Sequence, residues 1–106
     1  SGTHTVATIT GTDQGLTAVA RIDWVGLYGY AGSTQGAGSK IASTRRTASG
    51  SAWGDLDDID IGSSGTTSGM SFYWENGVLK INVSSSWQIT ARISITYHNV
   101  STFVAN

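Results

Sequence analysis

The 106-residue sequence has no cysteine, no proline and few charged residues, with six Lys and Arg against seven Asp and Glu. Without cysteine, the chain has no disulfide scaffold, no thiolate zinc site and no cysteine nucleophile. A net charge of −1 provides no electrostatic footprint for nucleic acid or an anionic membrane. No apolar run approaches the roughly 18 residues of a membrane span. We therefore expect neither a nucleic-acid partner nor membrane insertion.

Serine, threonine and glycine are abundant instead, and together they make up about two-fifths of the chain, well above their ordinary share. The length is typical of one hydrophobic core, so we expect a single domain over residues 1–106. Four Gly/Ser/Thr-rich segments are predicted as loops, since such residues favour turns and offer little to a core. These segments are residues 11–15, 31–39, 48–54 and 62–69.

The C-terminal third has the clearest strand patterns. From Trp87 to Tyr97 apolar and polar residues alternate strictly, which is typical of a strand with one buried face. Two shorter alternating runs, 70–75 and 79–84, lie on either side of Asn76-Gly77. Because a type I′ turn needs positive φ at both central residues, this dipeptide predicts a tight hairpin. Three consecutive antiparallel strands are therefore expected here.

The N-terminal half has less regular strand patterns. Residues 5–10, 40–47 and 57–61 are candidate strands, and a longer one runs from Ala18 to Tyr30. Its alternation slips by one residue after Val25, which predicts a β-bulge at Gly26. With no helical periodicity, the chain is predicted to be an all-β, antiparallel β-sandwich of jelly-roll type with about seven or eight strands.

The scarcity of charge has a consequence for the edges of such a sandwich. Proteins protect edge strands with Lys, Pro or inward charges, and this chain offers few of these. It must close the sheet, introduce bulges or cover its edges with another subunit. Ten aromatic residues are also many for so small a core, so some should stay exposed. Both features favour a homo-oligomer.

Residues 55–60 form the one cluster of charge, with four carboxylates. Oxygen ligands of this kind suit Ca²⁺, and Asp58 and Asp60 would share one face of a strand, but the spacing does not match an EF-hand loop. A solvated strand edge is the alternative, and we expect no cofactor. Another alternative pairs one of these carboxylates with Arg45 or Arg46 across a subunit interface.

The sequence offers little for catalysis. No G-x-S-x-G motif is present to position a serine nucleophile, and His4 and His98 have no defined partners. Glu75 precedes the Asn-Gly turn, so a position at the hairpin tip accounts for it without a role in a glycosidase carboxylate pair. We therefore expect a protein that is not an enzyme.

Aromatic residues outside the apolar strand faces are the candidates for ligand contact, because sugars stack on flat rings. Trp53 lies in a predicted Gly/Ser loop, and Tyr73 alternates with the apolar face of its strand. The predicted ligand-binding residues are Trp53, Tyr28, Tyr30 and Tyr73. Three other tryptophans follow apolar faces and are predicted to lie in the core: Trp24, Trp74 and Trp87.

Residues 18–30 and 72–97 combine Gly/Ser/Thr-rich surroundings with a short hairpin and a long strand near the C-terminal end. In these features the chain resembles the head or knob domains of bacteriophage fibres and spikes. The resemblance implies a jelly-roll-like sandwich at a virion surface, assembled as a trimer that attaches to a cell-surface glycan or receptor. It has no signature motif, so no binding residue is transferred. The alternative is a carbohydrate-binding module or small lectin of a secreted bacterial protein, with an extracellular location.

Overall fold

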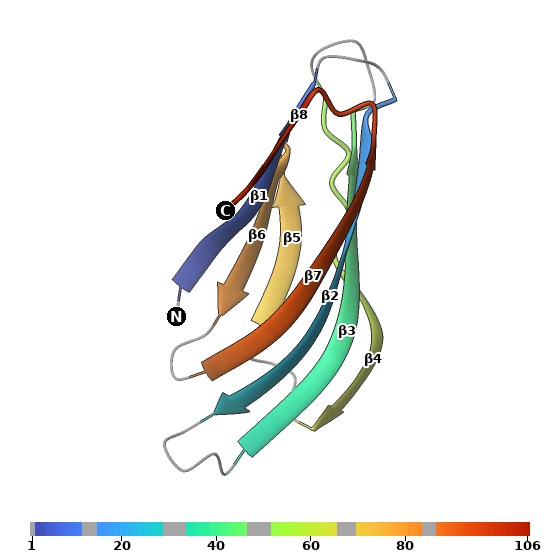
Figure 1. The fold of residues 1–106 in the computed structure, drawn as a ribbon. Coiled ribbons are helices and arrows are strands. Elements are labelled where there is room, and N and C mark those ends of the chain that lie inside the picture. Colours follow the sequence, from blue (N-terminus) through green and yellow to red (C-terminus); the bar gives the residue numbers. More distant parts are fainter. Residues whose placement is uncertain (1, 12–14, 29–33, 47–51, 66–69, 84–86) are drawn as a thin grey trace.

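The computed structural model describes residues 2–11, 15–28, 34–46, 52–65, 70–83 and 87–106, apart from the side chains of Tyr28, Thr34 and Trp87. Within these ranges the chain forms eight strands, and Figure 1 shows how they are arranged. No helix in the described part of the chain is long and apolar enough to cross a membrane. The strands are β1 (Gly2–Thr10), β2 (Thr17–Tyr28), β3 (Thr34–Arg45), β4 (Ile59–Gly65), β5 (Met70–Glu75), β6 (Val78–Val83), β7 (Trp87–His98) and β8 (Thr102–Ala105).

The strands form two antiparallel four-stranded sheets that face each other as a sandwich (Figure 1). We call the sheet with the order β5-β6-β1-β8 sheet A, and the sheet with the order β4-β3-β2-β7 sheet B. As in a jelly roll, the first strand pairs with the last and the second pairs with the last but one. The structure confirms the prediction of an all-β, antiparallel sandwich.

The predicted hairpin is present as β5 and β6. All six residues of β5 pair with β6, from Met70 opposite Val83 to Glu75 opposite Val78. Asn76 and Gly77 in the turn have φ values of 50° and 83°. Positive φ at both positions is what an Asn-Gly hairpin turn requires.

The core lies between β2 and β3 of sheet B and the β5-β6-β1 part of sheet A. Trp24 and Trp74 are almost fully buried, as the strand patterns predicted, and Phe72 at the centre is completely buried. The indole N–H of Trp74 donates a hydrogen bond of 3.1 Å to the carbonyl oxygen of Ala42 in β3. This bond satisfies a buried donor and links the two sheets.

The predicted bulge at Gly26 is wrong. Strand β2 pairs without interruption with β3 and β7 through this residue. Gly26 occupies an inward position, while Val25 and Leu27 stay on the outer face and are 49% and 39% exposed. Because the backbone pleat alternates without a slip, these apolar side chains do not move to the core.

Two segments predicted as loops are partly strands. Strand β3 begins at Thr34 and ends at Arg45, whereas a strand over 40–47 was expected. Strand β4 covers Ile59–Gly65 rather than 57–61. Their glycine- and serine-rich ends pair with each other, for example Gly38 with Ser63. Pairing with a neighbouring strand here overrides the low strand propensity of these residues.

Candidate functional site

Neither sheet closes into a barrel, so the sandwich has four edge strands: β5 and β8 in sheet A, and β4 and β7 in sheet B. An edge strand presents unpaired N–H and C=O groups, which makes it a template for pairing with another chain. How each edge is covered therefore shows where this molecule is open to a partner.

Residues 55–60, which we call the acidic segment, lie along the edge of β5. A carboxylate oxygen of Asp58 accepts a hydrogen bond of 3.3 Å from the backbone N–H of Phe72, and Asp55 accepts one of 3.3 Å from Asn76. Asp55 also accepts a bond from the Thr44 hydroxyl at 2.5 Å. Asp58 thus binds a backbone N–H group of the edge strand β5 that could otherwise pair with another strand, and Asp55 binds the backbone of the turn that follows β5.

Asp58 also forms an ion pair with Lys40, whose ammonium group lies 3.4 Å from the carboxylate. Lys40 sits opposite the buried Ile22 in the pairing of β3 with β2, so its stem lies on the inward face of sheet B. Asp60 is exposed and accepts a bond from Ser63 instead. In the part of the chain that the structure describes, no three His, Asp or Glu side chains gather as a metal site.

The edges of β4 and β8 are protected in other ways. Strand β8 has only four residues. Strand β4 has seven exposed residues, carries Asp60, and has an irregular register with β3 at Ser39 and Lys40. Short length, a charge and a bulge each discourage pairing with another chain.

Strand β7 lacks such protection. It has twelve residues, of which Arg92 is the one charged residue, and it pairs with β2 along its whole length. In the described ranges, no other strand pairs with it. None of its described side chains is fully buried, and Ala91 and Tyr97 are exposed although they lie opposite the buried Trp24 and Ala18. The inward face of β7 is therefore only partly covered, since its isoleucines are partly buried against the core while Ala91 and Tyr97 are exposed.

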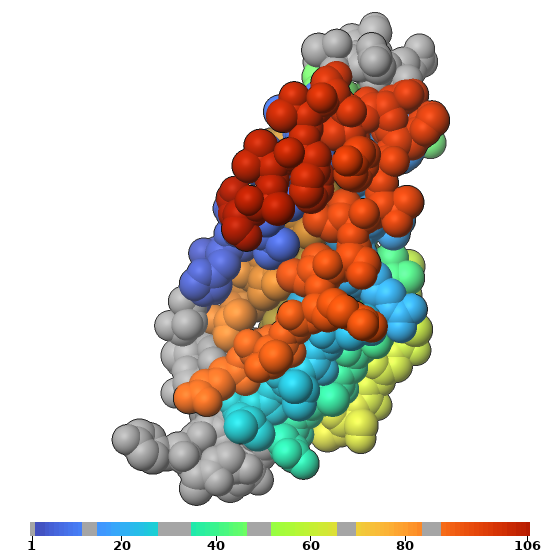
Figure 2. Space-filling view, viewed as in Figure 1, coloured from blue at the N-terminus to red at the C-terminus, as the bar shows by residue number. Residues whose placement is uncertain are grey.

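An apolar groove runs between β7 and β8. Figure 2 shows this side of the molecule, with β7 and β8 both on the viewed face. The groove has a volume of about 350 Å³. The rings of Tyr97 and Phe103 stack across it, with their centroids 5.3 Å apart and their planes at 11°. Its lining consists of Val6, Ala7, Ile93, Ile95, Tyr97, Phe103, Ala105 and Asn106.

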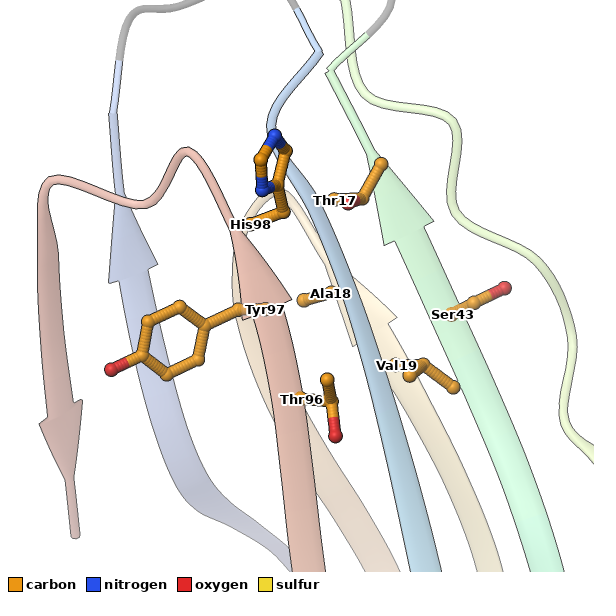
Figure 3. A pocket seen from close by; sticks show the side chains of 7 residues that line it. All are labelled: Thr17, Ala18, Val19, Ser43, Thr96, Tyr97 and His98. Carbon is orange, nitrogen blue, oxygen red and sulfur yellow. The ribbon is translucent and has the colours of Figure 1, made fainter.

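The outer face of sheet B has a shallow depression of about 240 Å³ near the C-terminal end of β7 (Figure 3). Its rim combines hydroxyl groups with the imidazole of His98. Figure 3 shows Tyr97 pointing away from this depression, toward β8. The residues around it are Thr17, Ala18, Val19, Ser43, Thr96, Tyr97 and His98.

The centre of the same outer face holds a charge cluster of one carboxylate and two guanidinium groups. Asp23 accepts a bond of 2.6 Å from the Ser39 hydroxyl and one of 3.2 Å from Arg21, and Arg92 lies 3.6 Å away. The Ser39 hydrogen bond, assisted by the two guanidinium groups, lowers the pKa of Asp23 below its ordinary value. The charge of Arg92 on β7 is thus matched within its own chain.

Trp53 has a structural position. Its ring is half-buried against the core, and the guanidinium of Arg46 lies 5.0 Å from the ring centroid. Arg46 also donates a bond of 2.6 Å to the carbonyl oxygen of Gly11. These contacts involve Arg46 within its own chain, and Lys40 rather than an arginine pairs with the acidic segment. Ligand binding by Trp53 stays a prediction.

Of the other predicted ligand contacts, Tyr73 is the one whose side chain the structure describes. Tyr73 is half-buried and lies opposite Lys80 on β6. The side chain of Tyr28 and the whole of Tyr30 lie outside the described residues. The structure instead exposes Tyr97, which the sequence pattern assigned to the buried face of its strand.

The residues considered for catalysis are also apart. His4 lies near the start of β1 in sheet A, and His98 is the last residue of β7 in sheet B. Glu75 forms an exposed ion pair of 2.6 Å with Lys80. Comparison with protein-family models, curated proteins and solved structures finds no match to this chain.

Proposed function

We propose that the chain is a non-enzymatic structural domain, working as an assembly of identical copies at a virion surface or fibre tip, where it attaches to a cell-surface glycan or receptor. The observation that carries this proposal is the open side of the sandwich between β7 and β8. There, Ala91 and Tyr97 on the inward face of a long strand remain exposed, and the three isoleucines of that strand are only partly buried against the core.

The open side has the features of a protein interface. Its groove is lined by aliphatic and aromatic side chains together with Asn106, and Tyr97 is 48% exposed. Aromatic residues are enriched at interfaces, and Lys, Glu and Asp are depleted there. The lining contains no charged residue. Covering it with another copy would remove apolar surface from water, which favours association by roughly 25 cal/mol for each Å².

Solution mass tests this proposal. We expect the wild-type domain to form a defined oligomer at micromolar concentration, and Tyr97→Ser to weaken its association. Ile61→Ser is the matched control, because Ile61 is equally exposed at 46% but lies on β4. A wild-type chain that stays monomeric at about 100 μM, well above the Kd range of stable complexes, would refute the proposal. If both substitutions weaken association equally, the interface does not lie on the open side.

The second candidate function is that of a carbohydrate-binding module, favoured by the depression in Figure 3. Hydroxyl groups and an imidazole on an open rim can hydrogen-bond to sugar hydroxyls. A glycan array probed with wild type, His98→Ala and Trp53→Ala tests it. Loss of binding in His98→Ala alone would locate the sugar at the depression. Loss in Trp53→Ala alone would support the sequence prediction instead, and a blank array for wild type would exclude both sites.

A further inference from the structure

Among the described edge strands, β7 is the longest, and its outer edge has no pairing partner in the described ranges. In the described part of the chain, the other three edges are short, irregular or covered by carboxylates, whereas β7 offers twelve residues without interruption. A long edge without Lys, Pro, a bulge or an inward charge is a template for strand pairing. The edge needs a partner that is equally long and equally uncharged.

We propose that this partner is β7 of a second copy, paired antiparallel about a two-fold axis at Ile93. The two B sheets then join into one eight-stranded sheet. This inference rests on the proposed self-association and specifies its surface and symmetry. Such an interface is isologous, because the same strand contributes to both sides.

The sequence of β7 is complementary to itself in this register. Residues that lie directly opposite each other in an antiparallel pair share a face, so the inward residues of one copy meet those of the other. Ile93 then lies opposite Ile93, Ala91 opposite Ile95, and Ile89 opposite Tyr97. All of these pairs are apolar.

The outer face is compatible with this register. Centring the pair on Ile93 places Arg92 opposite Ser94 and Thr90 opposite Thr96. Centring it on Arg92 would instead place two arginines directly opposite each other, which is unfavourable. In the Ile93 register the arginines are offset, and each keeps its own Asp23 within 3.6 Å.

Pairing within the chain shows that β7 accommodates a neighbour of this kind. Along its inner edge it pairs with β2 over all twelve residues without a register shift, with Ile93 opposite Ile22 and Ile95 opposite Ala20. The proposed outer pairs have the same character. The two-fold axis also brings the open sides of the two copies together, so each copy covers the exposed Tyr97 of the other.

Two charge-reversed variants test the register. Thr90 and Thr96 are exposed on the outer face, and their neighbours on β2 are Val25 and Val19, which are uncharged. New charges at these positions therefore face no charge directly across in their own chain. In the proposed dimer, T90K/T96K creates two Lys–Lys pairs and T90E/T96E creates two Glu–Glu pairs. Mixing the variants creates two Lys–Glu pairs instead.

We expect a wild-type dimer by native mass spectrometry and sedimentation. Each double variant should have a Kd raised by about tenfold or more, since like charges directly opposite are destabilising. An equimolar mixture should form a one-to-one heterodimer. Circular dichroism of each variant checks that the sheets are intact, and heterodimer formation from the mixture shows that both variants are competent to associate.

Other results are equally informative. A wild-type trimer whose mass is unaffected by T90K/T96K supports the proposed function and overturns the β7 pairing. A mixture that remains two monomers also overturns the pairing, whatever the wild-type mass. A wild-type chain that remains monomeric throughout overturns both proposals.

Discussion

Replacing Asp58 by alanine is expected to destabilise the fold, because this carboxylate performs two tasks at the edge of β5. It accepts the 3.3 Å hydrogen bond from the Phe72 N–H and lies 3.4 Å from the Lys40 ammonium group. Asp58→Ala leaves the backbone donor of a buried residue without its acceptor and leaves a largely buried ammonium group without its counter-ion.

The magnitude follows from these two losses. A hydrogen bond to a charged group contributes about 1.5–3 kcal/mol. The side chains of the ion pair are 14% and 23% exposed. Their interaction therefore lies between the roughly 0–1 kcal/mol of surface pairs and the larger cost of breaking a buried pair. We expect a total of about 2–4 kcal/mol, which would lower the Tm of a domain this small by about 10 °C or more.

Lys40→Met is the matched comparison. It removes the ion pair but keeps the cap on Phe72, and methionine retains much of the apolar packing of the lysine stem. We therefore expect a loss of about 1 kcal/mol or less. Urea unfolding of wild type, both single variants and the double variant provides the coupling energy. If Lys40→Met costs as much as Asp58→Ala, the edge cap contributes nothing and the reasoning is refuted.

Three further predictions concern single side chains. Trp74→Phe should cost about 1–3 kcal/mol in urea unfolding, because the buried carbonyl of Ala42 loses its donor. The lowered pKa of Asp23 contributes stability that is present above its ordinary value of 3.8 and is lost as the pH falls through the lower folded value. In Asp23→Asn, the free energy of unfolding should therefore decrease less than in wild type as the pH falls through this range. Gly77→Ala should destabilise the fold by more than about 1 kcal/mol in thermal unfolding, because φ is +83° and the new Cβ would meet atoms within 3 Å. Gly62→Ala is the control and should be near neutral, because a Cβ at Gly62 would enter open space.

The strands that could be predicted are those whose signal is local. Alternation over 87–97 and the Asn76-Gly77 turn each require only neighbouring residues to be read, and both correspond to observed elements. The ends of β3 and β4 carry no such signal, because glycine and serine have no apolar face. They are strands because they pair with each other, as Gly36 does with Gly65. That pairing depends on residues about 30 positions apart along the chain.

The candidate site was harder to predict for a related reason. Alternation assigns Tyr97 to the inward face of its strand, and the structure agrees with that orientation. Whether an inward side chain is buried depends on the opposite sheet, and β8 is only four residues long. The open side therefore arises from a mismatch in length between two strands of different sheets. Trp53 is the opposite case. The sequence places its ring in a loop and predicts a ligand contact, whereas in the structure the ring packs against Gly77 and Arg46.

The scarcity of charge and the open side are connected. With seven carboxylates in the chain, the structure uses Asp55 and Asp58 at the edge of β5 and Asp60 at β4. Asp23 pairs with Arg92 on the outer face and is shared with Arg21, so the one charged residue of β7 has a carboxylate partner within the chain. An edge that is both long and regular differs from the other three, which are short, irregular or covered by carboxylates. The distribution of its few charges therefore leaves β7 as the edge at which this sandwich can extend.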